Sequence, residues 1–228
     1  MFTKKSIYTP AYILISSLMI LLYFTEPSFA SQNQNSTNSL STKERIDTII
    51  SILGTSFALF TLWRGIEQYR KDKKWKKAEL VAKEMKEFKS DPVIKNVMLM
   101  LDWNRRKINL SQEVSIFNID VELCKALQAK TYMNEPKGFT PAETLLRDHF
   151  DVFLDYLERF ESFIETGLVS KEDFYPYLNY WFNIIGNKQS ERKSLEFYEI
   201  LWQYIDFFGY IKVQKLMSRY GYCIKPNT

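Results

Sequence analysis

Apolar residues divide the chain into two parts: an N-terminal part with two long apolar runs, and a C-terminal part with helical periodicity. The second run, Ile46–Trp63, covers eighteen positions and contains a single charge, Asp47. As a helix rising about 1.5 Å per residue it spans roughly 27 Å, close to the thickness of a bilayer's hydrocarbon layer. We therefore expect residues 46–63 to form a transmembrane helix. The alternative is a buried helical hairpin of a soluble protein.

The first apolar run, Ala11–Phe24, is shorter and follows a basic start at Lys4 and Lys5. Ser28-Phe29-Ala30 then has the small-x-small pattern of a signal-peptide cleavage site. Residues 1–30 are predicted to be a secretory signal peptide or, if they are retained, a first membrane anchor. Residues 31–45 are polar, with too few apolar side chains to fold alone, and we expect them to form an extracytoplasmic spacer.

Basic residues are concentrated in a stem, residues 64–77, directly after the second apolar run. Basic residues next to a membrane helix are in excess on its cytoplasmic side, so we expect the C-terminal side of the span to be cytoplasmic. We also expect the stem to bind the membrane surface, because a basic residue near an anionic leaflet contributes on the order of 1 kcal/mol. The residues concerned are Arg64, Arg70, Lys71, Lys73, Lys74, Lys76 and Lys77.

Two small residues, Gly54 and Ala58, lie four positions apart within the predicted span. Such a pair lets two helix backbones approach closely and is typical of membrane-helix dimers. Small residues are also frequent in membrane helices for other reasons, so the pair predicts either self-association or nothing specific.

Residues 78–228 are predicted to form one helical domain, and the whole chain is interpreted as all-α. Its clearest signal is Thr140-Pro141-Ala142-Glu143, a capping box that opens a long helix closed by Gly167. Apolar residues along this helix recur at steps of four and three, so we expect it to be the spine of the core. Further helices are predicted near residues 75–90, 92–103, 120–129, 170–186 (bent at Pro176), 190–209 and 211–220, with a loop over 105–118.

Charge and cysteine usage exclude some function classes. Of 31 basic and 27 acidic residues, eleven and five lie in residues 1–77, so residues 78–228 carry a net charge of −2. The basic excess therefore belongs to the membrane stem, and nucleic-acid binding is not expected. Cys124 and Cys223 share no motif, and we expect both to be free and buried.

Residue types needed for catalysis or metal binding are scarce. His149 is the only histidine, so a histidine-dependent catalyst must use it, but a packed or exposed side chain explains it fully and we do not expect catalysis. Zinc sites draw on several Cys or His ligands, so we expect no metal and no other cofactor. Asp151, Asp155 and Glu158 share one helical face, where a solvated surface is the simpler interpretation than a cation site.

The most concentrated polar and aromatic cluster is Asp102-Trp103-Asn104-Arg105-Arg106, at a predicted helix end. Arginine pairs bind phosphate or acidic partners, but they also cap helix-end carbonyls and form surface ion pairs. Asp102, Arg105, Arg106 and Arg147 are therefore the candidate contacts for a ligand or partner.

Several motifs resemble an uncharacterised bacterial group of membrane-anchored helical proteins of unknown function, many of them cyanobacterial. They are Trp75-Lys-Lys-Ala-Glu…Phe88, Asp91-Pro92…Met98-Leu-Met-Leu-Asp102-Trp103, and Thr140-Pro141-Ala-Glu143…Arg147-Asp148…Phe153-Leu154-Asp155. The resemblance covers roughly residues 64–222. It implies a helical fold in the inner (plasma) membrane or another bacterial membrane, and no activity.

The leading functional hypothesis is a non-enzymatic, membrane-tethered helical module that binds a protein partner at the cytoplasmic face. An alternative is an enzyme or small-ligand sensor with Asp102, Arg105, Arg106 or Arg147 in its pocket. A third is an oligomeric or pore-forming membrane protein that self-associates through Gly54 and Ala58.

Overall fold

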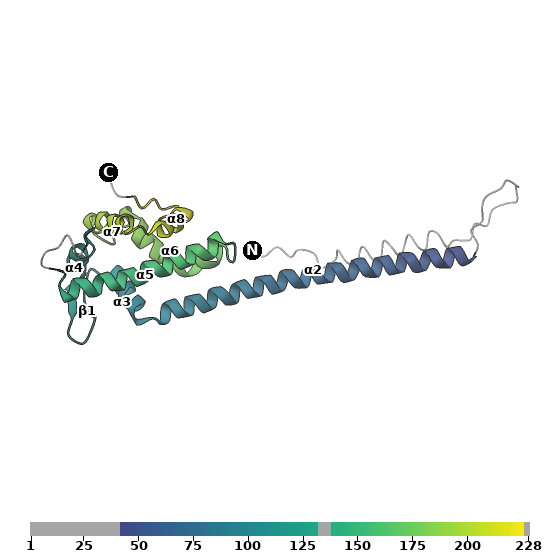
Figure 1. Ribbon diagram of the computed structural model, residues 1–228, viewed down its shortest axis with the longest axis horizontal. Helices are drawn as coiled ribbons and strands as arrows, with labels where there is room; N and C mark the ends of the chain where they lie inside the picture. Colours follow the sequence, from purple (N-terminus) through teal and green to yellow (C-terminus); the bar gives the residue numbers. More distant parts are fainter. Residues whose placement is uncertain (1–41, 132–137, 226–228) are drawn as a thin grey trace. The chain divides into compact units, whose positions relative to one another are not determined.

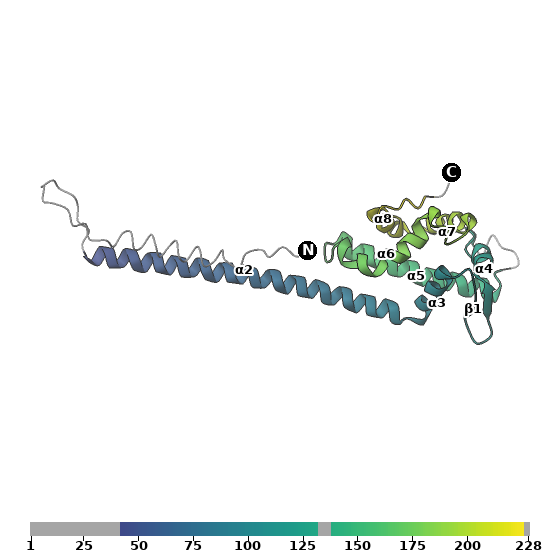
Figure 2. The ribbon, with the colours of Figure 1, turned by 180° about the vertical axis from the view of Figure 1, so that it is seen from behind.

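The computed structural model describes residues 42–131 and 138–225 and is mostly helical (Figures 1 and 2). The predicted signal peptide or anchor, residues 1–30, lies outside the described residues. The elements are α2 (Thr42–Ser90), α3 (Pro92–Asp102), β1 (Arg105–Asn109), β2 (Ser115–Asn118), α4 (Ile119–Ala126), α5 (Pro141–Glu165), α6 (Lys171–Gly186), the 3₁₀ turn η2 (Lys188–Ser190), α7 (Leu195–Phe207) and α8 (Ile211–Arg219).

The chain forms two compact units, residues 1–60 and 61–228, and the division falls within α2. The predicted span, the stem and the helix expected near residues 75–90 all belong to this single helix of 49 residues. Helix α2 begins at Thr42, so the last residues of the predicted spacer are helical instead of unstructured.

Among the described residues, one helix is long and apolar enough to cross a membrane, and it is α2. No part of its apolar window is buried. A core helix of a soluble protein would bury those side chains, since removal of apolar area from water is what holds such a helix in place. The exposed window therefore agrees with the membrane interpretation and not with the buried-hairpin alternative.

Helix α5 is the spine of the second unit, as predicted. The Glu143 amide donates to Thr140 Oγ1 (3.2 Å) and the Thr140 amide donates to Glu143 Oε2 (2.8 Å), which confirms the capping box. The helix contacts α3, α4 and α8, and its apolar seam is buried except for half-buried Ile164. The buried seam residues are Leu146, Phe150, Phe153, Leu157 and Phe160.

The C-terminal turns of α2 enter the same core. Phe88 is fully buried, and its ring centroid lies 6.0 Å from that of Phe153 and 5.4 Å from that of Phe160. Val81 and Met85 are also buried, whereas Trp75, at the start of the helix predicted for residues 75–90, is 72% exposed. The fully buried residues of α2 therefore start at Val81, and half-buried Leu80 packs against the core just before them.

A short antiparallel hairpin, β1–β2, replaces the loop predicted for residues 105–118. Ile108 pairs with Ile116 and both are buried, while a bulge lies between Arg105 and Ile108. The prediction of an all-α domain is therefore correct in outline and wrong at this hairpin. With one inward residue on each strand and a bulge in one of them, the two strands show no alternation long enough to recognise.

One helix start differs from the prediction, which placed it at Ser190. Ser194, not Ser190, caps α7, since the Phe197 amide donates to Ser194 Oγ (3.2 Å) and Ser190 belongs to η2 instead. Helix α6 includes Pro176, in agreement with the helix predicted for residues 170–186. Gly167 adopts a positive φ of 71° after α5, the left-handed conformation that a glycine accepts without strain, and so forms the α5–α6 turn.

Candidate functional site

The polar cluster after α3 is held in place by a buried cation, Lys193. Lys193 is 4% exposed, and its ammonium donates to the Trp103 carbonyl (2.8 Å), Asn104 Oδ1 (2.9 Å) and Asp120 Oδ1 (2.9 Å). An ammonium has three donors, and all three are used here. Lys193 thereby joins the end of α3, the start of α4 and the segment before α7.

Burial lowers the pKa of Lys193, and the hydrogen bond and charge of Asp120 act in the opposite direction. Burial is also the main reason that the pKa of the nearby Cys124 thiol is raised to about 11, with the charges of Glu196 and Asp120 adding to it. A thiol with so high a pKa is almost entirely protonated at neutral pH and reacts poorly as a nucleophile. Cys124 therefore packs as a small apolar side chain, as predicted, whereas Cys223 is exposed, contrary to prediction.

The hairpin held by this network presents a basic and aromatic surface, which we call the hairpin surface. Its members are Trp103, Arg105, Arg106, Lys107 and Phe117, all of them exposed. The Arg106 guanidinium lies 5.4 Å from the Trp103 ring centroid, a cation–π distance. None of the three basic residues forms an ion pair within the described part of the chain, so the positive charge of this surface is not neutralised there.

Asp102, the first candidate residue of the cluster, contacts α6 and the segment before α7, not the hairpin surface. Its carboxylate accepts a short hydrogen bond from the Tyr180 hydroxyl and lies 3.9 Å from the Arg192 guanidinium. Asp102 therefore ties α3 to α6 and to the segment before α7. It is part of the support of the hairpin and not of its exposed face.

Arg147 lies in α5 and serves a different purpose. It is 8% exposed, and its guanidinium donates to the carbonyls of Ala126 (2.8 Å), Gln128 (3.1 Å) and Lys130 (2.9 Å). These are the carbonyls at and after the C-terminal end of α4, which lack donors within the helix. Arg147 is thus a helix cap, and it does not join Asp102, Arg105 and Arg106 in a common pocket.

The acidic and histidine residues considered for chemistry have structural partners. His149 is buried and its Nε2 lies 3.3 Å from Asn96 Nδ2. Asp151 Oδ1 accepts from the hydroxyls of Tyr204 (2.6 Å) and Tyr210 (2.8 Å), so this residue is not on the solvated face that was expected. Glu158 accepts from the Lys212 amide (3.1 Å), and Asp155 alone of the three is exposed.

The membrane-related candidates lie along α2. Gly54 and Ala58 are exposed on the helix, and a side chain added at Gly54 would meet nothing within 4 Å. All seven basic stem residues are on the same helix, and Arg64 and Lys77 are separated by thirteen residues, or roughly 20 Å of helix axis. The stem is therefore a rod of basic residues, and its members differ in their distance from the end of the span.

No group of three or more potential metal-ligating side chains occurs among the described residues. Comparison of the chain with protein-family models, with curated proteins and with solved structures gives no match. The resemblance to membrane-anchored helical proteins stays a sequence-based expectation.

Sequence reasoning missed Lys193, the residue that organises the cluster. Its partners lie 73 to 90 positions earlier in the chain, so no local pattern connects them. The one local signal is that Lys193 precedes the Ser194 cap of α7, and the misplacement of that cap at Ser190 concealed it.

Proposed function

We propose that this protein is a membrane-tethered interaction module whose hairpin surface binds an acidic segment of a protein partner at the cytoplasmic face. Helix α2 is the tether, with residues 46–63 crossing the bilayer. The observation that supports this function most directly is the exposed basic and aromatic hairpin, held in place by a buried lysine.

The composition of the hairpin surface suits a protein partner. Aromatic residues and arginine are enriched at protein interfaces and supply most of the binding energy, and Trp103, Arg106 and Phe117 are of these types. Arg105, Arg106 and Lys107 add three positive charges without described acidic partners, which favours an acidic segment. A nucleic acid is a poorer match, because the net charge of residues 78–228 is −2.

The hairpin surface is tested by photocrosslinking in native membranes, with a photoreactive amino acid replacing Phe117 in the full chain. We expect one protein to be crosslinked reproducibly, and the triple variant R105E/R106E/K107E to abolish the crosslink. The matched control is K83E/K86E/K95E, which changes the charge equally at exposed lysines of α2 and α3 and leaves the crosslink intact. Crosslinks to nucleic acid, or equal loss in both variants, would refute the assignment.

Topology is tested separately with the one exposed cysteine of the described chain, Cys223. If the domain is cytoplasmic, a membrane-impermeant thiol reagent leaves Cys223 unlabelled in intact cells and labels it after permeabilisation. Cys124 stays unlabelled in both states while the protein is folded, because it is buried and its pKa is about 11. Labelling of Cys223 in intact cells would overturn the cytoplasmic placement whatever the crosslinking result.

A further inference from the structure

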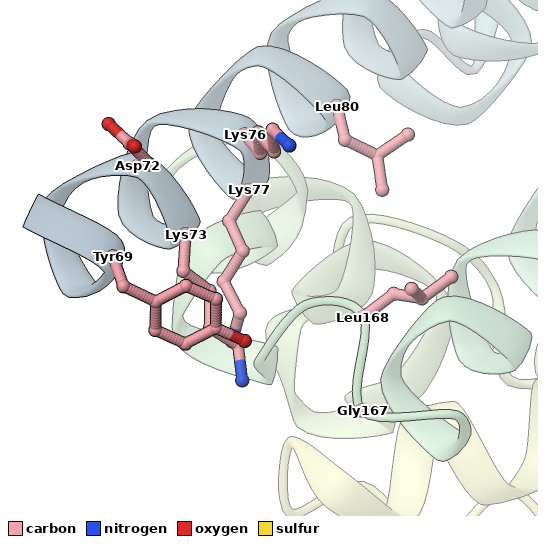
Figure 3. Close-up of a pocket in the computed structure, with 8 residues that line it drawn as sticks. All are labelled: Tyr69, Asp72, Lys73, Lys76, Lys77, Leu80, Gly167 and Leu168. Atoms are coloured by element: carbon pink, nitrogen blue, oxygen red, sulfur yellow. The ribbon is translucent and has the colours of Figure 1, made fainter. Parts of the chain in front are cut away.

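A groove lined by lysines lies between α2 and the α5–α6 turn, within the second unit (Figure 3). It has a volume of about 450 Å³ and is lined by Tyr69, Asp72, Lys73, Lys76, Lys77, Leu80, Gly167 and Leu168. Positions 69, 73, 76, 77 and 80 follow helical spacing and so share one face of α2. Gly167 and Leu168, about 90 residues later in the chain, form the opposite wall.

We propose that this groove binds the phosphate-bearing headgroup of an anionic phospholipid, with its lysines at the phosphate and its leucines at the less polar part of the lipid. The proposal rests on the membrane placement of α2 proposed above. General attraction of a basic stem to a membrane would involve all of its basic residues. In the proposed site only three of the stem's lysines contact the lipid, together with a residue from the α5–α6 turn.

The charge of the groove favours an anion. Lys73, Lys76 and Lys77 form no ion pair with any described residue, and Asp72 is the single acidic residue in the lining. The Asp72 carboxylate accepts a hydrogen bond from Gln68 (3.3 Å), and Figure 3 shows it directed away from Tyr69 and Lys77. By contrast, Lys71, outside the lining, is paired with Glu67 at 2.9 Å.

The apolar part of the lining favours an amphiphile over a simple ion. Leu168 is 53% exposed and Tyr69 is 67% exposed, and both border the lysines of the groove. A ligand with an apolar portion that covers these two side chains removes apolar area from water, and this favours its binding. A phospholipid has both the negative charge and the apolar portion that this lining would contact.

The position along α2 is also suitable. Tyr69 and Lys73 lie six and ten residues beyond Trp63, roughly 9 and 15 Å along the helix axis. The headgroup layer extends about 5–8 Å beyond the hydrocarbon. A tilt of about 20°, the average for membrane helices, lowers a height of roughly 9 Å by less than about 1 Å, so Tyr69 lies at the outer edge of this layer. The Tyr69 end of the groove thus borders the headgroups, and the long side chain of Lys73 can extend back toward them.

Lysine footprinting of the full-length protein in nanodiscs tests the proposal, with an amine-acetylating reagent and mass spectrometry. We expect nanodiscs containing phosphatidylglycerol to slow acetylation of Lys73, Lys76 and Lys77 relative to phosphatidylcholine nanodiscs. Lys71 and Lys74, on the same stem but outside the lining, and Lys83, beyond the groove, should be unaffected. Equal protection of all stem lysines would show diffuse surface attraction and refute a built groove, as would no protection at all.

Three further experiments test the role of the lysines, the role of Leu168 and the identity of the ligand. K73Q/K76Q/K77Q should weaken retention of phosphatidylglycerol on the order of 100-fold, from about fivefold for each lysine. Leu168→Asp should abolish the protection of the unaltered lysines, while Leu168→Asn retains it in part. Protection by inorganic phosphate in phosphatidylcholine nanodiscs, equal to that by phosphatidylglycerol, would make the groove a soluble-anion site and overturn the lipid assignment.

Failure of this inference is distinguishable from failure of the proposed function. The hairpin variant R105E/R106E/K107E leaves the groove unchanged and should retain the footprint. If Cys223 proves extracytoplasmic, the membrane placement fails and the groove inference fails with it. If the topology holds and the footprint is absent, the groove inference alone is lost.

Discussion

Replacing Phe160 by alanine will destabilise the second unit by about 3–5 kcal/mol, which is typical for deleting a fully buried phenylalanine. Phe160 is fully buried in α5, and its ring centroid lies 5.4 Å from that of Phe88 in α2 and 4.8 Å from that of Phe174 in α6. The substitution therefore opens a cavity where three helices meet. Rigid helices collapse poorly around such a cavity, so little of the loss is recovered.

Thermal unfolding of the full chain in detergent, followed by circular dichroism, measures this effect. A loss of this size lowers the midpoint by roughly 6–20 °C in a domain of this length. The control is Phe207→Ala in α7, where the ring is 49% exposed and the expected change is within about 0.5 kcal/mol. Similar midpoints for the two variants would mean that Phe160 is not at the centre of the core.

Replacing Lys193 by methionine will destabilise the unit by about 3 kcal/mol and will loosen the hairpin more than the rest of the fold. The methionine is similar in length but cannot donate, so it leaves the Asp120 carboxylate, the Trp103 carbonyl and Asn104 without their partner. Breaking a buried ion pair by removing one member costs about 3–5 kcal/mol. The lower end applies because the Asp120 side chain is 21% exposed and water can reach it.

Two measurements test this: the free energy of unfolding of the variant, and the amide hydrogen exchange rates of the hairpin compared with the rest of the unit. The double variant K193M/D120N should recover part of the loss, since it removes the unpaired charge. Lys215→Met is the control, because Lys215 is 52% exposed and its pair with Glu165 contributes at most about 1 kcal/mol. If K193M were no more harmful than the control, or exchange rose evenly over the unit, Lys193 would not be what holds the hairpin.

Local chemistry made most helices predictable. The Thr140 capping box, the Asp91-Pro92 start of α3 and the glycine that follows α5 each act within a few residues, so their sequence signals are complete in themselves. The heptad-like spacing of apolar residues in α5 likewise identified the core, because a helix that is surrounded by several others buries one continuous face.

The candidate site depended on contacts that sequence does not encode locally. Arg147 looked like a ligand contact because an arginine in a polar stretch is ambiguous until its acceptors are known, and these are backbone carbonyls 17 to 21 residues earlier. The lysines of the groove were visible in the sequence only as part of the basic stem. What separates Lys73, Lys76 and Lys77 from their neighbours is their nearness to Leu168, which depends on how α2 meets the α5–α6 turn.

The helical continuity of α2 through residues 61–90 also has a mechanical consequence. A flexible linker would absorb a pull between membrane and domain by uncoiling, whereas a helix transmits it along its axis with little extension. Such a pull arrives first at Val81, Met85 and Phe88, where α2 enters the core, and loads these contacts in shear. If residues 46–63 cross the membrane as proposed, tension at that end would therefore act directly on the packing of α2 against the domain.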